Sequence, residues 1–234
     1  MSYIPSKNIL IIQTAFIGDT ILASQFARTI KRYFPEVCVH FLLRKGNETV
    51  IQGLDFIDHV WVWDKSRGKW KNLFKLIAKL RHFSFEHVFN LHRHFNSVLV
   101  TMFMKSPSKV GFKQNPLSFF YDQKVNHQIP HPHHFHEVQR NLELLEVTLS
   151  TKVTVDHLRP SLPMTDEHRK KIEKFIPKDR TISDYFVVAP ASVWKTKAWS
   201  PEKYVPSCGK TLQVSKRSKR WSILKPGKSP TRPP

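Results

Sequence analysis

The segment Asn8–Phe34 places the strongest constraint on the fold of this 234-residue chain. It opens with the consecutive apolar residues 9–12, a run that is too short and too β-branched for a helix and therefore predicts a buried strand. A tight turn follows, and then Leu22, Phe26 and Ile30 recur at the spacing of a helix with one buried face. Strand, tight turn and helix form the opening unit of a parallel α/β sheet.

Strands and helices are expected to alternate in the residues that follow. Further strands are expected at 37–43, 57–63, 85–91 and 109–112, and helices at 70–80, 97–104 and 136–145. This alternation predicts a doubly wound parallel sheet. In the strand at 57–63, Val60 and Val62 compete with Trp61 and Trp63 for the inward face, so the pattern does not decide which pair is buried.

One carboxylate, Asp19, stands at the start of the first predicted helix. It directly follows the turn at the carboxyl end of a strand, where parallel sheets bind ligands. An acidic residue in a first helical turn is favoured simply by capping and by the helix dipole. The functional alternative is a general base over a cleft. The turn carries no GxGxxG pattern, so the classical dinucleotide fingerprint is absent.

The chain is strongly basic, with a formal net charge of +20. Part of this charge lies at 206–234, a stretch that contains lysines, arginines and prolines but no acidic residue. A basic surface serves nucleic acid, an anionic membrane or an acidic substrate, and charge alone does not choose among them. The stretch has no apolar periodicity and is expected to be disordered.

Cysteine content and apolar patterning predict a cytoplasmic protein. The chain has only 2 Cys, Cys38 and Cys208, which form no disulfide framework and no metal-ligand pattern. The first residues show no signal-peptide pattern, and no apolar stretch reaches the length of a membrane-spanning helix.

The segment 127–136 is rich in histidine: His127, His131, His133, His134 and His136. Neutral imidazole is a common metal ligand, so a metal site is one interpretation. However, Pro130 and Pro132 predict a loop, and no carboxylate or thiolate stands among these histidines. A loop that helps an anionic sugar acceptor to bind, or a solvated surface loop, agrees better with this composition.

Several segments together resemble the ADP-heptose:lipopolysaccharide heptosyltransferases, glycosyltransferase family 9. The run Ile17–Leu22 resembles the family's IGDxxL signature. Further resemblances follow in the family's order at 89–93 (an NLH-type strand end), 109–112 (VGF), 116–121 (a loop) and 136–145 (the HxVxRNLxLL helix). Each pattern is weak alone, and the resemblance rests on their shared order.

The resemblance implies a fold and a reaction. The implied fold is α/β of the GT-B type, with a complete N-terminal Rossmann-like domain and the start of a second one. The implied reaction is inverting transfer of heptose from ADP-heptose to an inner-core sugar of lipopolysaccharide. Asp19 would be the catalytic base, and Gly18, His92 and Arg93 would contact the acceptor. No metal and no cofactor are implied, since no DxD pattern accompanies these motifs and ADP-heptose is the donor substrate.

The donor side is expected in the loop 190–201, which follows a predicted strand at 185–189. The loop resembles the family's diphosphate-binding segment, so Ser192 and Lys197 are implied as phosphate contacts. Lys195 is the alternative cation, because the register is not fixed. The loop can also be an ordinary basic connection between a strand and a helix.

We expect an acceptor-side domain at 1–155, the beginning of a donor-binding domain at 156–205 and a basic tail at 206–234. Pro206 would stop the helix that begins near Ser200, which predicts a truncated second domain. The expected partner is the lipopolysaccharide core acceptor, at a location peripheral to the inner face of the inner membrane, with an anionic membrane surface allowed and no specific nucleic acid. The alternatives are an inactive remnant of the enzyme and a basic nucleic-acid-binding protein.

Overall fold

The computed structural model describes residues 8–127, 136–154, 159–162 and 164–174, together with Ser200 and Lys203. The chain divides into two compact units, Met1–Pro163 and Met164–Pro234. The predicted strand at 185–189 and the basic tail at 206–234 lie outside the described residues.

The first unit is built on a parallel sheet of six strands. These are β1 (Asn8–Gln13), β2 (Cys38–Arg44), β3 (His59–Trp63), β4 (Phe85–Asn90), β5 (Ser108–Phe112) and β6 (Gln123–Val125). Their order in the sheet is β3-β2-β1-β4-β5-β6, so the chain runs outward from β1 to β3 and then returns to the other side of β1. The predicted doubly wound α/β sheet is confirmed.

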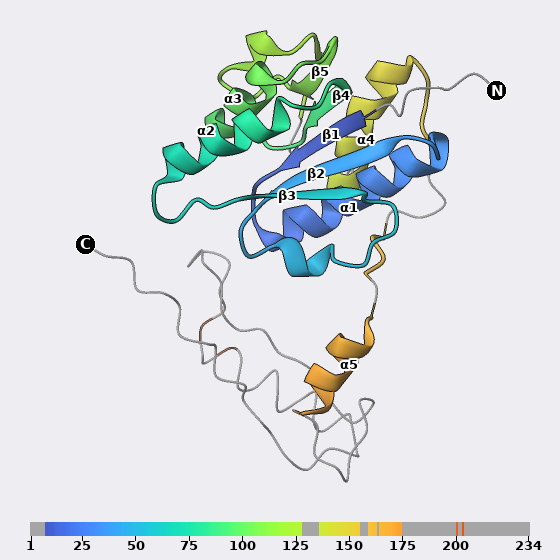
Figure 1. Cartoon of the computed structure of the whole chain (residues 1–234). Helices are drawn as coiled ribbons and strands as arrows, with labels where there is room; N and C mark the ends of the chain where they lie inside the picture. The colour runs from blue at the N-terminus through green and yellow to red at the C-terminus, as the bar shows by residue number, and fades with distance from the viewer. Residues whose placement is uncertain are drawn as a thin grey trace, which may run out of the picture. The chain divides into compact units, whose positions relative to one another are not determined.

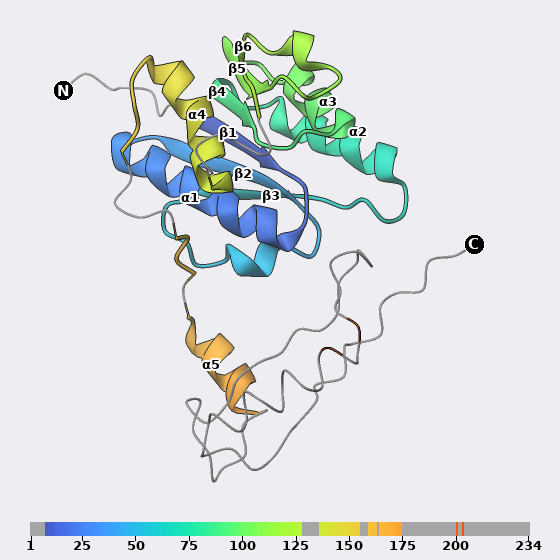
Figure 2. The same ribbon diagram turned by 180° about the vertical axis from the view of Figure 1, so that it is seen from behind.

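Helices cover both faces of this sheet (Figures 1 and 2). Helices α1 (Ile17–Tyr33) and α4 (Glu137–Leu149) lie on one face, and α2 (Lys69–Leu80) and α3 (Phe95–Phe103) lie on the other. Two short 3-10 helices, η1 (Glu48–Val50) and η2 (Ser118–Phe120), occupy loops.

Alternation along β1 explains why the chain needs helices on both faces. Ile9 and Ile11 pack into the core beneath α1 and α4, whereas Leu10 and Ile12 pack into the core beneath α2 and α3. Successive side chains of a strand point to opposite faces, so an unbroken apolar run buries both. The expected inner face of α1 also forms, because the ring of Phe26 meets that of Phe89 edge to face at 5.1 Å.

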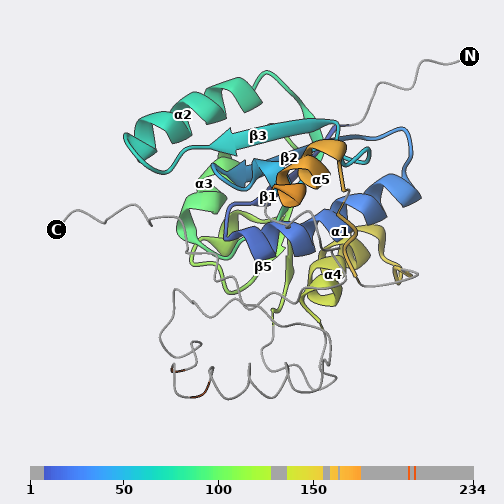
Figure 3. The same ribbon diagram turned by 90° about the horizontal axis from the view of Figure 1, so that it is seen from below.

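The structure decides which face of β3 is buried. Trp63 is completely buried, while Val60 and Val62 are exposed. Helix α2 lies alongside β3 (Figure 3) and covers the tryptophan side, where Trp63 Nε1 donates to the Lys69 carbonyl at 3.3 Å. The edge position of β3 leaves the valine side less covered, which a sequence pattern does not reveal.

Strand β6 was not predicted. It has only three residues, and Val125 is the only apolar residue among them. It forms because β5 offers an unpaired edge, along which Val110 to Phe112 align with Gln123 to Val125. A strand this short leaves no periodic pattern in the sequence.

The second unit contains the helix α5 (Asp166–Glu173). Thr165 is its N-cap, and the hydroxyl of Thr165 accepts a hydrogen bond from the His168 backbone N–H at 3.2 Å. Asp166 and Glu167 occupy the first turn, where the helix dipole favours acidic residues. Across the helices that the structure describes, none has the length and apolarity to span a membrane.

Candidate active site

The candidate site lies at the carboxyl edge of the sheet. From β1 the chain adds β2 and β3 on one side of the sheet and then β4, β5 and β6 on the other side. The loops that follow the neighbouring strands β1 and β4 therefore lead in opposite directions. In open α/β sheets this switch point is where ligands bind. The β1–α1 loop and the β4–α3 loop, with the loops after β2 and β3 beside them, therefore form the region in which the site residues are sought.

The β1–α1 loop is held by side chains from three neighbouring loops. Lys65, after β3, donates through Nζ to the Thr14 carbonyl at 2.7 Å. Asn47, after β2, is buried and donates through Nδ2 to the Ala15 carbonyl at 3.1 Å. His92, after β4, has its Nδ1 2.9 Å from the Thr14 hydroxyl. The backbone that leads to Asp19 is thus fixed from both sides of β1.

Asp19 has the capping role that was one of the two weighed from the sequence. Its Oδ2 accepts a hydrogen bond from the Phe16 backbone N–H at 3.1 Å, so the carboxylate caps the first turn of α1. The side chain is half-buried, and Oδ1 has no hydrogen bond to any residue that the structure describes. Capping therefore occupies one oxygen and leaves the other available to a ligand. The capping interpretation is confirmed, and the base remains a proposal.

Gly18 lies beside Asp19 on an open surface. It is exposed, and a Cβ atom built on it would meet nothing within 4 Å. The fold itself therefore does not require glycine here. A ligand that approaches the backbone closely would give such a residue a role.

His92 is held as a neutral side chain. Burial, followed by the charges of Lys65, His94 and Arg93, lowers the pKa of His92 to about 3. Its backbone N–H also donates to Asn90 Oδ1 at 3.0 Å, which fixes the start of the β4–α3 loop. A neutral imidazole in this loop can exchange a hydrogen bond with a sugar hydroxyl without adding charge.

Arg93 is positioned by a chain of polar contacts. Its Nη1 lies 3.3 Å from Nδ1 of His127, so that this nitrogen accepts and His127 Nε2 donates to Glu137 at 3.0 Å. Although burial opposes the effect, hydrogen bonds from His127 and Arg140 lower the pKa of Glu137 to about 2. Glu137 is therefore an anion that anchors the chain of contacts leading to Arg93.

Two of the clustered histidines have structural roles. His127 is buried, and His136 caps α4 by accepting from the Val138 backbone N–H at 3.3 Å. The interpretation as a solvated loop was wrong for His127, whereas His136 is exposed to solvent while it caps the helix. His131, His133 and His134 lie outside the described residues.

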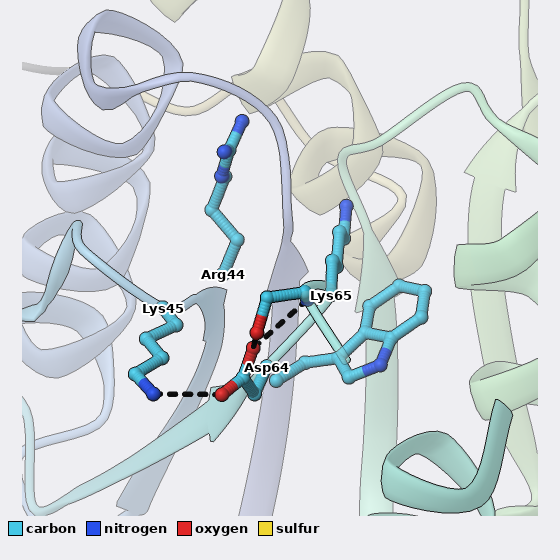
Figure 4. A pocket seen from close by; sticks show the side chains of 6 residues that line it. Arg44, Lys45, Asp64 and Lys65 are labelled. Carbon is cyan, nitrogen blue, oxygen red and sulfur yellow. Dashed lines mark hydrogen bonds and ion pairs between the residues drawn. The ribbon is translucent and has the colours of Figure 1, made fainter. Parts of the chain in front are cut away.

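A pocket with a volume of about 330 Å³ lies at the ends of β2 and β3 (Figure 4). It is lined by Arg44, Lys45, Trp63, Asp64, Lys65 and Ser66. Lys45 points at Asp64 and forms an ion pair of 2.7 Å. Arg44 and Lys65 form no ion pair with a described residue, so the pocket presents two cations to an anionic ligand.

Lys65 is the cation that joins this pocket to the β1–α1 loop. Besides its bond to Thr14, its ammonium lies 4.5 Å from the centre of the Trp63 ring. Burial, followed by the charges of Arg44 and Lys69, lowers the pKa of Lys65 to about 8. Its protonated form therefore predominates at neutral pH but is lost under mildly alkaline conditions.

Sequence reasoning identified Gly18 and Asp19, which lie in the first turn of α1, and His92 and Arg93, which lie in the β4–α3 loop. It missed Arg44, Asn47 and Lys65. The available signal was their position, since each ends or closely follows a predicted strand. Ser192 and Lys197, and the alternative Lys195, lie outside the described residues, so the donor side stays a prediction.

Cys38, His40 and His59 form a cluster at the opposite edge of the sheet, with potential ligand atoms within 4.8 Å of one another. Trp61 Nε1 donates to His40 Nδ1 at 3.0 Å, and an indole nitrogen can only donate. Burial, followed by the charge of His59, lowers the pKa of His40 to about 4, so the ring is neutral and its proton lies on Nε2. Because that nitrogen offers no lone pair, we do not assign a metal to this cluster.

The sequence of this chain matches a known protein family over more than half of its length. Residues 73–208, more than half of the chain, match glycosyltransferase family 9 (heptosyltransferase). The lipopolysaccharide core heptosyltransferase OpsX of Haemophilus influenzae is 22% identical over 200 residues, which are 85% of this chain and 55% of OpsX. The chain thus spans about half the length of this curated relative.

Two solved structures share the fold. A family 9 glycosyltransferase of Veillonella parvula matches with a TM-score of 0.72 at 16% identity, covering 89% of this chain and 61% of that chain. The E. coli heptosyltransferase WaaC with ADP-2-deoxy-2-fluoro heptose matches with a TM-score of 0.65 at 16% identity, covering 88% of this chain and 66% of that chain. At these identities the likeness concerns the fold, and function has to be argued from the site.

Proposed function

The chain belongs to glycosyltransferase family 9, and we propose that it transfers heptose from ADP-heptose, with inversion, to an inner-core sugar of lipopolysaccharide. The GT-B domain at the N-terminus would hold the acceptor, and the loop 190–201 would hold the donor. OpsX is a lipopolysaccharide core heptosyltransferase, and WaaC is a heptosyltransferase solved with ADP-2-deoxy-2-fluoro heptose, which supports this choice of substrates.

One observation carries the proposal: a carboxylate and three cations share the carboxyl edge of the sheet. Asp19 keeps one oxygen available after β1, Arg44 and Lys65 face the pocket after β2 and β3, and Arg93 follows β4. Anionic acceptor groups are favoured by such cations through charge-assisted hydrogen bonds. A core oligosaccharide that carries acidic groups fits this distribution.

The proposed chemistry begins with removal of a proton from the acceptor hydroxyl by Asp19. The acceptor oxygen forms a bond to the anomeric carbon of the heptose while the bond from that carbon to ADP breaks on the opposite face. The departing diphosphate gains negative charge, which the ammonium of Lys197 and the hydroxyl of Ser192 would stabilise. Asp19 then releases its proton to solvent. No cofactor is proposed, since the sugar nucleotide is itself a substrate, and no metal is proposed, since the sequence has no DxD pattern.

Turnover of the full chain tests the proposal. The purified 234-residue protein is mixed with ADP-heptose and a heptose-deficient lipopolysaccharide, and ADP release and product mass are followed. Asp19→Asn keeps the size of the side chain and an oxygen for capping but removes the base, so the rate should fall by roughly 10²–10⁴-fold. Asp55→Asn, at an exposed position in the loop before β3, is the matched control and should retain the parental rate.

Binding measurements separate the outcomes. Failure of the parent to turn over substrate, with a folded chain, would reject the transferase and favour the inactive-remnant alternative. Calorimetry with ADP then tests the donor register. A charge-assisted hydrogen bond is worth about 1.5–3 kcal/mol, so Lys197→Ala should weaken ADP binding at least about tenfold. A larger loss in Lys195→Ala would move the assignment to Lys195.

A further inference from the structure

Helix α2 exposes two large aromatic side chains that the core does not use. Its inner face is complete without them, since Leu73, Leu76, Ile77 and Leu80 are buried against the sheet. On the outside, Trp70 is 47% exposed and Phe74 is 55% exposed. They stand four residues apart and therefore lie in one column along the helix.

A column of lysines runs beside the aromatic column. Lys71, Lys75 and Lys79 are exposed and recur at the same spacing. Lys69 adds a fourth cation, with its ammonium 5.1 Å from the centre of the Trp70 ring. The helix contains no acidic residue, so nothing within it neutralises these charges.

The neighbouring helix continues the apolar character of this face. Helix α3, beside α2 on the same face of the sheet (Figure 1), has no charged residue and exposes Phe95 and Phe103. Helix α4, on the opposite face of the sheet, differs because Glu137, Glu143 and Glu146 give it acidic character. The combination of exposed aromatic residues with several lysines and no acidic residue therefore distinguishes α2 from α3 and α4.

We propose that the outward face of α2 docks onto an anionic lipid bilayer. Indole and phenyl rings are stable at the level of the lipid headgroups, where lysines meet the lipid phosphates. A second copy of the chain is a poorer occupant, because a symmetric contact would bring the lysines of both α2 helices together. The helix lies on the bilayer without crossing it, since it has 12 residues and four of them are lysines.

Docking through α2 would place the candidate active site near the bilayer. The helix begins immediately after the loop that carries Lys65 and Ser66, two residues that line the cationic pocket. An acceptor anchored in the bilayer would then reach this edge of the sheet. The docking surface itself consists of residues outside the proposed catalytic machinery, so its test does not depend on turnover.

Vesicle flotation with the full chain tests the proposal. The vesicles contain either phosphatidylcholine alone or phosphatidylcholine with about one-third phosphatidylglycerol. We expect at least tenfold tighter binding to the anionic vesicles, weakened by added salt. Because the stretch 206–234 is also basic, charge attraction alone does not establish docking through α2.

Paired variants isolate α2 from this general attraction. Trp70→Ser combined with Phe74→Ser should weaken binding at least tenfold, and Val147→Ser, an exposed apolar position on α4, is its control. Lys71→Gln combined with Lys75→Gln should weaken binding at least fivefold. Its charge-matched control is Lys124→Gln combined with Lys152→Gln, two exposed lysines away from α2. Circular dichroism and the melting temperature verify the fold of each variant.

Brominated lipid provides a readout of position. Bromine on the upper acyl chain should quench tryptophan fluorescence in the parent, and Trp70→Phe should bind almost as well while losing most of that quenching. Unchanged vesicle binding in the folded Trp70→Ser/Phe74→Ser variant would overturn the proposal. A change in sedimentation state of that variant, without a change in lipid binding, would assign the face to a second copy instead.

Discussion

The hydroxyl of Thr14 and Nδ1 of His92 lie 2.9 Å apart and join the loops that follow β1 and β4. These strands are neighbours, and the register Ile12↔Asn90 brings their carboxyl ends to the same level. The contact therefore spans the switch point of the sheet, where a ligand would approach. It also ties the segment that leads to Asp19 to the segment that carries Arg93.

Replacement of Thr14 by valine should loosen this connection. Valine keeps the shape of the buried side chain but leaves His92 Nδ1 without its partner, at a cost of about 1–3 kcal/mol in the free energy of unfolding. The KM for acceptor should rise in parallel. Urea unfolding and initial-rate kinetics measure the two effects, and Thr14→Ser, which keeps the hydroxyl, should restore most of both. A Thr14→Val protein with parental stability would show that the contact contributes little.

The charge of Lys65 predicts the pH dependence of acceptor binding. Its pKa is lowered to about 8, so the ammonium is mostly protonated at pH 7 and mostly neutral at about pH 9. Binding of an anionic acceptor should therefore weaken across this interval, up to about tenfold, as one charge-assisted hydrogen bond is lost. Acceptor titrations at several pH values measure the change.

Lys65→Arg is the decisive control for this prediction. Arginine stays protonated throughout the interval and can still donate to the Thr14 carbonyl. Its acceptor affinity should be nearly independent of pH from about 7 to 9. An equal loss in parent and variant would assign the pH dependence to another group.

The sequence predicts the parts of the site that local patterns specify. Asp19 follows an apolar strand and begins an amphipathic helix, so both its location and its capping role follow from its neighbours. His92 and Arg93 are found in the same way, because they follow the apolar end of β4. In these cases the fold class and the rule for parallel sheets are sufficient.

Tertiary contacts, which local sequence patterns do not encode, determine the remaining features of the fold and of the site. Asn47 and Lys65 reach the β1–α1 loop only because β2 and β3 align beside β1. Which residue of each loop makes the contact depends on the length of its side chain and on the direction in which that side chain points. The role of His127 was misinterpreted because it is one of several histidines close together in the sequence. Nothing in the local pattern shows that its ring is buried and contacts Arg93 and Glu137. Burial of Trp63 likewise depends on where α2 packs.

Two glycines should respond oppositely to alanine. A Cβ atom at Gly111 would overlap the ring of Tyr121, which is buried and has little room to move. Gly111→Ala should therefore cost roughly 1–3 kcal/mol in unfolding free energy. Gly18→Ala meets no neighbour within 4 Å and should keep or slightly raise stability in the first turn of α1.

Activity separates the two glycine variants further. If an acceptor approaches the backbone at Gly18, then Gly18→Ala should raise the acceptor KM in a protein of normal stability. Thermal denaturation and kinetics of both variants provide the comparison. A Gly18→Ala enzyme with parental KM would remove Gly18 from the acceptor site, and a stable Gly111→Ala protein would contradict the close packing against Tyr121.

Acid should destabilise the first unit through His40. The ring is buried, accepts from Trp61 and stacks edge to face on Phe85 at 5.2 Å. Burial and the charge of His59, opposed by Asp58, lower its pKa to about 4, below the value near 6.5 in an unfolded chain. Between these values the unfolded chain binds the additional proton, so stability is full above about pH 6.5 and falls toward pH 4.

The variant His40→Asn tests this assignment. Its amide oxygen can still accept from Trp61, while the titrating ring is removed. The lost aromatic packing lowers stability at every pH by a similar amount, whereas the slope between pH 6.5 and 4 should be shallower than in the parent. The pKa of His92 is also lowered, to about 3, so His92 destabilises both proteins in acid to the same extent. The difference between the two curves of stability against pH therefore reports His40 alone. Urea unfolding at closely spaced pH values provides both curves, and parallel slopes would exclude His40 as the source of acid sensitivity.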